Sequence, residues 1–224
     1  MERSKVGIII PAYNEEATIL NVINKVEKYG VPIIIDDCSS DKTQELINYQ
    51  DNKVLYYKNP KNIGYEKSIQ KGFEIAIKNN FDYLITYDAD NQHFPEDILQ
   101  IKLYLMEGNS IAIGERENFQ RFSEKLFSKV FKFFFDIEDP LTGLKGYRSS
   151  LFKENDQVFD SNYLVGVELL IRALIKDRKI AKFKIKTIKR KGNPRYGNIF
   201  TGNYKILRAL FYCLLLYISN KNLK

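Results

Sequence analysis

The chain has 224 residues, of which 44% are hydrophobic and 28% are charged. This composition excludes intrinsic disorder, and the length predicts one domain with a sizeable core. Because 35 Lys and Arg outnumber 28 Asp and Glu, giving a formal net charge of +7, we expect anionic partners such as phosphates, nucleic acid or an acidic membrane surface.

The few cysteine and histidine residues exclude two kinds of site. Cys38 and Cys213 lie far apart in the sequence, and His93 is the single histidine. The sequence therefore has too few Cys and His residues for a zinc site of clustered Cys and His, and a single His for a Ser/His catalytic triad. No signal-peptide pattern precedes the first strand-like run, so we expect a reducing cytoplasmic location.

Short β-branched runs alternate with longer amphipathic stretches through the first half of the chain. The predicted strands are residues 6–10, 33–35, 54–57, 83–87 and 111–113, and the predicted helices are residues 16–28, 42–49, 66–78 and 96–106. This alternation is typical of βαβ units and predicts an α/β fold with a mainly parallel sheet. Ligands of such a sheet bind beyond the carboxyl ends of its strands.

Polar loops follow three of these strands, at residues 11–15, 36–41 and 88–93. Asp41 or Ser40 is able to cap the following helix, whereas Asp37 comes too early in its loop to be a cap. Because the carboxyl ends of parallel strands meet at one edge, we expect the three loops to converge there.

The third loop reads Asp88-Ala89-Asp90-Asn91-Gln92-His93. The oxygens of Asp88, Asp90 and Gln92 suit Mg²⁺ or Mn²⁺ that also holds substrate phosphates. A strand-to-helix turn is the alternative, because Asp and Asn favour turns and Pro95 suits the start of a helix.

The pattern changes after residue 113. Gly114-Glu115-Arg116 leads to an aromatic and basic helix at 121–135, a turn at 136–143, a helix at 165–176, a strand at 182–186 and a basic loop at 187–201. Acids at strand ends are few here and bases are many. We therefore expect a single domain, residues 1–201, in which the first half, 1–115, binds a nucleotide and the second half, 116–201, binds its partner substrate.

Residues 202–224 form a predicted C-terminal helix that is apolar nearly all round. Its apolar run, residues 209–218, is too short to cross a bilayer. A helix docked on the domain, a dimer contact and a helix in the membrane interface all remain open. The basic flanks and the aromatic helix 121–135 favour the inner face of the cell membrane.

Several motifs resemble the family 2 glycosyltransferases, which have the GT-A fold that binds nucleotide-diphospho-sugars. They are Ile8-Ile9-Ile10-Pro11-Ala12-Tyr13-Asn14-Glu15, Ile34-Ile35-Asp36-Asp37-Cys38-Ser39-Ser40-Asp41-Lys42-Thr43, and Asn62-Ile63-Gly64 followed by Lys71-Gly72-Phe73. A narrower similarity to the polyprenyl (dolichyl) phosphate sugar synthase branch lies in Asp88-Ala89-Asp90-Asn91-Gln92-His93-Phe94-Pro95-Glu96, Ile113-Gly114-Glu115-Arg116 and Asp139-Pro140-Leu141-Thr142-Gly143. The match runs from about residue 6 to about residue 197.

The resemblance implies roles for individual residues. Those implied to bind the nucleotide are Pro11, Ala12, Tyr13, Glu15, Asp37, Asp88 and Ala89. The implied ligands of Mg²⁺ or Mn²⁺ are Asp88, Asp90 and Gln92. The implied catalytic residues are Asp90, Arg116 and Arg195. Those implied to bind an acceptor phosphate are Lys125, Ser128, Lys189, Arg190 and Arg195.

Two departures from the branch affect the acceptor residues. Glu124 stands where relatives carry an arginine, although Arg121 lies one helical turn before Lys125 on the same face. In the late basic loop, Lys189 stands where relatives carry an arginine, and Arg195 stands where they carry a lysine. A lysine cannot make the two-pronged contact with phosphate that an arginine makes.

The resemblance implies an inverting, metal-dependent enzyme that moves one sugar from a GDP- or UDP-sugar to a polyprenyl phosphate. The alternative within the family is transfer to a hydroxyl of a surface glycan of the lipopolysaccharide, capsule or teichoic acid type. A non-catalytic nucleotide or nucleic-acid binder is a third hypothesis. Acids at the sheet edge would repel a polyanion, so we expect no nucleic-acid partner.

Overall fold

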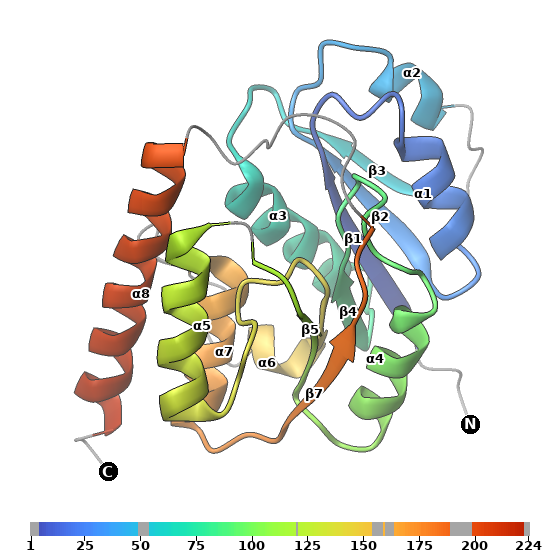
Figure 1. Cartoon of the computed structure of the whole chain (residues 1–224). Helices are drawn as coiled ribbons and strands as arrows, with labels where there is room; N and C mark the ends of the chain where they lie inside the picture. Colours follow the sequence, from blue (N-terminus) through green and yellow to red (C-terminus); the bar gives the residue numbers. More distant parts are fainter. Residues whose placement is uncertain are drawn as a thin grey trace.

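The computed structural model describes residues 5–48, 54–119, 121–153, 159, 164–188 and 199–221 (Figure 1). Within these residues, a seven-stranded sheet has the strand order β3-β2-β1-β4-β6-β5-β7. The strands are β1 Val6–Ala12, β2 Val31–Asp36, β3 Leu55–Lys58, β4 Tyr83–Thr86, β5 Ile111–Arg116, β6 Lys145–Arg148 and β7 Ile180–Ile185. The helices are α1 Ile19–Val26, α2 Thr43–Asn48, α3 Tyr65–Lys78, α4 Asp97–Met106, α5 Phe122–Phe135, α6 Ser149–Lys153, α7 Val165–Ile175 and α8 Ile199–Lys221.

The predicted α/β fold with a mainly parallel sheet is confirmed. β1 pairs in parallel with β2 and β4, β2 with β3, and β5 with β7. The exception is β6, which runs antiparallel between β4 and β5. Neither β6 nor the short helix α6 follows from the sequence pattern, because Lys145-Gly146-Tyr147-Arg148 has no apolar run. Gly146 is required there, since a Cβ would lie 2.1 Å from Ile101 of α4.

Helices cover both faces of the sheet. Alternate strand residues point to opposite faces, so Ile9 and Ile33 pack in one core while Ile8 and Ile34 pack in the other. The first core is closed by α3, α5, α7 and α8, and the second by α1 and α4. Both halves of the chain therefore share the two cores.

The last helix, α8, docks on the domain. It lies beside α5 in Figure 1 and contacts both α5 and α7. Its inner face buries Ile206, Ala209, Leu210 and Cys213. The helix begins at Ile199, a few residues before the predicted start. In the part of the chain that the structure describes, no helix is long and apolar enough to span a bilayer.

Strand register brings the polar loops together. Ala12 at the end of β1 pairs with Asp36 at the end of β2, and the Asp37 amide donates to Ala12 O at 2.8 Å. On the other side of β1, the Tyr87 amide after β4 donates to Ile9 O at 3.0 Å. The loops after β1, β2 and β4 thus leave the same edge of the sheet, as predicted.

Candidate active site

A cavity of about 460 Å³ lies beyond the carboxyl ends of β1, β2 and β4. Nine of its lining residues carry a site prediction from the sequence: Pro11, Ala12, Tyr13, Glu15, Asp37, Asp88, Ala89, Asp90 and Arg116. The remaining lining residues are Asn62, Gly64, Tyr65, Glu66, Ser68, Arg121, Glu124, Leu141, Gly143, Leu164 and Ile206. The cavity therefore joins the predicted nucleotide side to residues of α5, α8 and the loop before β6.

Non-glycine residues with positive φ shape the three strand-end loops. They are Asn14, Cys38 and Asn91, with φ of 54°, 65° and 61°. Such conformations are uncommon and cluster at functional sites. The first two loops also hold each other, because the Ser40 amide donates to Asn14 Oδ1 and the Asn14 amide donates to Ser39 Oγ, each at 2.9 Å.

Asp37 fixes the entrance to α3. Its carboxylate accepts hydrogen bonds from Asn59 Nδ2 at 2.9 Å and from the amides of Ile63 and Gly64 at 2.8 Å each. Gly64 has φ of +90°, a conformation that favours glycine. Asp37 therefore lines the cavity itself, and it also fixes the loop before α3, which forms another part of the cavity wall.

Asp88 lies on the cavity floor among three close neighbours. Its Oδ1 accepts the Tyr65 hydroxyl at 2.9 Å, and its Oδ2 lies 3.3 Å from Nε2 of His93. A Cβ at Gly143 would lie 2.0 Å from Oδ2, so this close approach requires glycine. Burial alone would raise the pKa of Asp88, but contacts with His93 and Tyr65 and the charge of Arg116 hold it below its ordinary value. Asp88 is therefore an ionised acceptor at neutral pH.

The predicted metal ligands are placed differently from one another. Asp88 and Asp90 line the cavity, whereas Gln92 does not, and its Nε2 donates to Ile188 O at 3.1 Å. No group of three or more His, Cys, Asp or Glu side chains forms a ligand cluster among the residues described. Two half-buried carboxylates facing one cavity still match the oxygen donors that hard divalent cations take together with substrate phosphates.

Arg116 at the end of β5 is held by a buried acid. Its Nε and Nη2 donate to Asp139 at 2.6 and 3.1 Å, and its amide donates to Asp139 Oδ2 at 3.1 Å. Burial opposes the charge, but the bonds to Asp139 raise the pKa of Arg116. The guanidinium is therefore permanently charged, and this two-pronged pair fixes it at the cavity wall.

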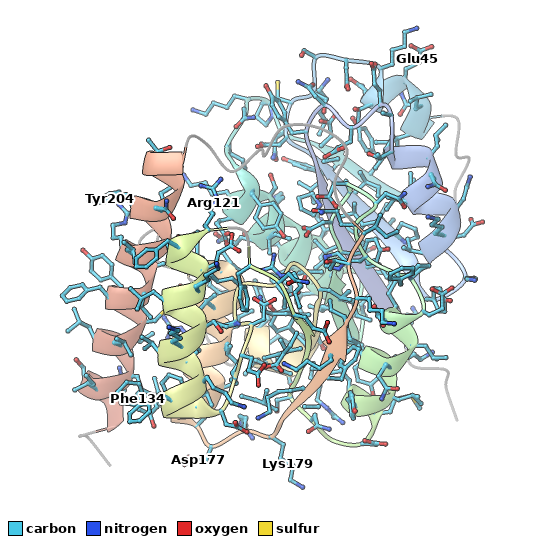
Figure 2. The ribbon with its side chains drawn as sticks, in the orientation of Figure 1. Glu45, Arg121, Phe134, Asp177, Lys179 and Tyr204 are labelled. Carbon is cyan, nitrogen blue, oxygen red and sulfur yellow. The ribbon has the colours of Figure 1, made fainter. Side chains whose placement is uncertain are left out.

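The acceptor side differs from the sequence-based expectation. Lys125 is exposed and Ser128 is half-buried, and neither lines the cavity. Arg121 and Glu124 line it instead. Figure 2 shows Arg121 at the start of α5. The predicted residues Lys189, Arg190 and Arg195 lie outside the described residues.

Comparison with known proteins identifies the family. The family described as "Glycosyl transferase family 2" matches residues 7–155. The chain belongs to this family. The family predicted from the motifs is thus confirmed, and the chain is a glycosyltransferase.

Relatives of this family 2 glycosyltransferase include proteins of the predicted branch. A UDP-N-acetylglucosamine–dolichyl-phosphate N-acetylglucosaminyltransferase of Methanococcus voltae is 29% identical, over 96% of this chain and 96% of its own length. A dolichol-phosphate mannosyltransferase of Pyrococcus furiosus is 30% identical, over 78% of this chain and 53% of its own length.

A solved structure shares the GT-A fold with this family 2 glycosyltransferase. Glucosyl-3-phosphoglycerate synthase of Mycobacterium tuberculosis, in complex with Mn²⁺, UDP and phosphoglyceric acid, has a TM-score of 0.72 at 18% identity. The match covers 94% of this chain and 78% of that one. The predicted fold class is therefore confirmed by this likeness.

Sequence reasoning assigned no role to several lining residues of this family 2 glycosyltransferase. Tyr65 and Glu66 belong to the first turn of α3. The only feature of the sequence that marks them as site residues is their position directly after the motif Asn62-Ile63-Gly64. Leu141, Leu164 and Ile206 come from three distant segments, so only the tertiary structure brings them to one end of the cavity.

Proposed function

We propose that the enzyme transfers one sugar from a nucleotide-diphospho-sugar to a polyprenyl phosphate, with Mg²⁺ or Mn²⁺ as cofactor and inversion at the anomeric carbon. The observation that carries this proposal is the composition of one continuous cavity. Its β1–β2–β4 side is acidic and hydrogen-bonded. Its other side combines two arginines and one glutamate with apolar residues: Arg116, Arg121, Glu124, Leu141, Leu164 and Ile206. Such a cavity suits a polar donor and an acceptor that has both a phosphate and a lipid tail.

The names of the relatives support the same substrates. The Methanococcus voltae relative is named for UDP-N-acetylglucosamine and dolichyl phosphate, and the Pyrococcus furiosus relative for dolichol phosphate and mannose. The first of them matches nearly the whole length of both chains. We therefore infer that the donor is a sugar linked to UDP or GDP and that the acceptor is a polyprenyl phosphate.

On the donor side we propose that residues 1–115 bind the nucleotide. The Tyr13 ring, 41% exposed beside the cavity, offers a stacking surface, and Asp37 and Glu15 offer carboxylates to the base and ribose. We assign Pro11, Ala12 and Ala89 to the walls of the same site. Asp88 and Asp90 would hold a divalent cation that neutralises the leaving diphosphate, whereas Gln92, the third predicted ligand, lies outside the cavity lining.

The reaction needs no general base when the acceptor is a phosphate, because its oxygen is already an anion. That oxygen attacks the anomeric carbon while the bond from this carbon to the diphosphate oxygen breaks on the opposite face. The leaving nucleoside diphosphate keeps the electron pair. Arg116 and Arg121 line the cavity and have the charge to orient the acceptor phosphate and stabilise the transferred charge. We propose residues 116–201 as the acceptor half.

We propose a peripheral position at the inner face of the cell membrane. Large apolar side chains are exposed along the two neighbouring helices α5 and α8: Phe122, Leu126, Phe133, Phe134, Tyr204, Leu207, Phe211, Leu215 and Ile218. Figure 2 shows Phe134 and Tyr204 on the α8 side of the molecule. Exposed Lys125, Lys129 and Lys205 lie on the same helices and suit an anionic lipid surface.

The apolar surface begins at the cavity. Arg121 lines the cavity and the next residue, Phe122, is 72% exposed, while Ile206 lines it and Leu207 is exposed beside it. A lipid that brings its phosphate to Arg121 would therefore have apolar side chains along its path.

A transfer assay with two acceptors tests the proposal. Purified protein receives UDP- and GDP-sugars, Mn²⁺ or EDTA, and either a short polyprenyl phosphate or an oligosaccharide. We expect a sugar–phosphate–lipid product, detected by mass spectrometry, that forms with Mn²⁺ and not with EDTA. Transfer to the oligosaccharide alone would overturn the proposed acceptor and favour a glycan hydroxyl.

A further inference from the structure

A small chamber with both polar and apolar lining residues adjoins the cavity. Its volume is about 50 Å³, and it shares Tyr65, Glu66 and Gly143 with the main cavity. Tyr65 and Gly143 both contact or closely approach Asp88. The chamber therefore lies close to Asp88, a proposed ligand of the cation that would hold the donor diphosphate, so a sugar attached to that diphosphate would lie nearby.

Two residues of β6 provide hydrogen-bond donors to the chamber. Lys145 and Tyr147 lie on the same face of the strand, while Gly146 between them packs against α4. Lys145 is 4% exposed, and its Nζ donates to Thr142 O at 2.6 Å. Across the residues described, its other two N–H groups and the Tyr147 hydroxyl have no hydrogen-bond partner. These donors are available to a ligand.

Glu66 adds a carboxyl group to the lining of the chamber. Its Oε2 accepts the Val165 amide at 2.7 Å, and the other oxygen has no partner in the described part of the chain. Burial raises the pKa of Glu66 to about 7, although the charge of Lys145 works against this. Burial likewise lowers the pKa of Lys145 to about 8. Two ionisable groups thus lie in a small chamber with hydrogen-bonding capacity unused, which is costly unless a ligand or water supplies partners.

We propose that this chamber binds the acylamino group of an N-acylated amino sugar on the donor, an inference that rests on the proposed function. An amide has one carbonyl acceptor and one N–H donor. Lys145 and Tyr147 match the carbonyl oxygen, and the free oxygen of Glu66 matches the N–H. The chamber is thus a specificity site for the sugar.

The size of the chamber agrees with this ligand. A volume of about 50 Å³ corresponds to roughly three or four water positions. An acetamido group has four heavy atoms: nitrogen, carbonyl carbon, oxygen and methyl. The methyl group has apolar neighbours in Ile69, Leu164 and Val167, which also line the chamber.

Two other sugars fit less well. A plain hexose offers a hydroxyl with one heavy atom in place of the four of an acetamido group, so it makes fewer hydrogen bonds to Lys145, Tyr147 and Glu66. A uronic acid would bring a carboxylate close to the ionised Asp88, whose charge opposes it. Sites built to hydrogen-bond a group discriminate strongly against analogues that lack it.

Donor binding by the full chain tests the proposal. Isothermal titration with Mn²⁺ compares UDP, UDP-glucose, UDP-N-acetylglucosamine, UDP-glucuronic acid and GDP-mannose. We expect UDP-N-acetylglucosamine to bind at least about 10-fold more tightly than UDP-glucose. The ratio of the Kd of UDP-glucose to that of UDP-N-acetylglucosamine should fall to within about threefold of one in Lys145→Met and in Glu66→Gln. The Kd of UDP itself should change by less than about threefold in both variants.

Control variants separate the chamber from general effects on charge. Lys71 and Glu74 form a half-exposed ion pair at 3.1 Å on α3, away from the cavity. Lys71→Met and Glu74→Gln should leave the ratio unchanged. Binding of UDP reports that each variant is folded, and Tyr147→Phe gives a third measurement at the chamber should Lys145→Met not fold.

The outcomes distinguish this inference from the proposed function. Equal binding of the glucose and N-acetylglucosamine donors, or tighter binding of UDP-glucuronic acid or GDP-mannose, overturns the acylamino site while leaving glycosyl transfer intact. An unchanged ratio in the chamber variants also overturns it. Absence of binding for all five nucleotides, together with absence of transfer, overturns the proposed function itself.

Discussion

On the proposed donor side of the cavity, polar side chains are fixed by hydrogen bonds between loops, whereas on the proposed acceptor side two helices expose apolar side chains to solvent. Asp37 accepts three hydrogen bonds, and Asp88 is held between Tyr65 and His93. On α5, by contrast, Phe122 and Phe133 are 72% and 83% exposed. The proposed donor site is therefore preorganised by hydrogen bonds within the chain, whereas under the proposed function the acceptor site is completed by the lipid surface that contacts α5 and α8.

The largest effect is expected from Asp90→Asn on the donor side. The change removes a charge from the proposed cation site without altering the core, so turnover should fall about 100- to 1,000-fold while the melting temperature stays nearly constant. Rates with Mn²⁺ and a thermal melt measure both. Glu96→Gln, an exposed acid outside the cavity, is the control. Turnover within a factor of three of wild type would remove Asp90 from the mechanism.

Arg121→Ala tests the acceptor side. Loss of a charged hydrogen bond to phosphate should raise the KM for polyprenyl phosphate about 10- to 100-fold. Lys125→Ala should change it less than about threefold, because Lys125 is exposed outside the cavity. Measured KM values in the opposite order would restore the sequence-based assignment of Lys125.

The double variant Phe134→Ser with Phe211→Ser tests the exposed apolar surface. The two rings are 59% and 60% exposed, and losing their burial in lipid should weaken binding to phosphatidylglycerol vesicles by about 10-fold or more. Co-sedimentation measures this. Leu99→Ser with Leu103→Ser on α4, at 50% and 45% exposure, is the matched control. An equal loss in both pairs would contradict a specific membrane face.

The smallest effect concerns the pH dependence of stability. The pKa of Glu66 rises from 4.5 to about 7 on folding, so the folded state binds this proton more tightly than the unfolded state. The resulting stability is present at about pH 4.5 and below and is lost as pH rises through 7. Because the side chain is only partly buried, we expect this loss to be about 1 to 2 kcal/mol.

Glu66→Gln should remove that loss. Urea unfolding measures the free energy of unfolding of both proteins at pH 5 and pH 8. Between these pH values, the free energy of unfolding of wild type should fall by about 1 to 2 kcal/mol more than that of the variant. A constant difference between the two proteins across that range would show that Glu66 does not titrate there.

The sequence predicted the donor side better than the acceptor side, for a physical reason. Strand ends can be read from apolar runs, and parallel strands bring their ends to one edge, so Asp37, Asp88 and Asp90 were expected together. The cavity confirms that placement, while their roles stay predictions. The partner of Asp37, Asn59, lies 22 residues away along the chain, and no local pattern marks it.

The acceptor side depends on packing that local patterns do not encode. β6 has charged and glycine residues where a strand is expected to be apolar, and it is recognised only by its pairing with β4 and β5. On α5, family spacing favoured Lys125 and Ser128. The helix instead presents its first turn to the cavity, and Lys125 lies a full turn further along the axis than Arg121.

The lone imidazole of this protein is a natural spectroscopic reporter. His93 lies 3.3 Å from Asp88, its ring packs edge-on against Tyr87, and its buried Nδ1 has no partner among the described residues. Because the chain contains a single histidine, its ring protons give one uncrowded set of NMR resonances. Arrival of a cation or a diphosphate at the neighbouring carboxylate should therefore be visible in solution, without isotopic labels, probes or mutations.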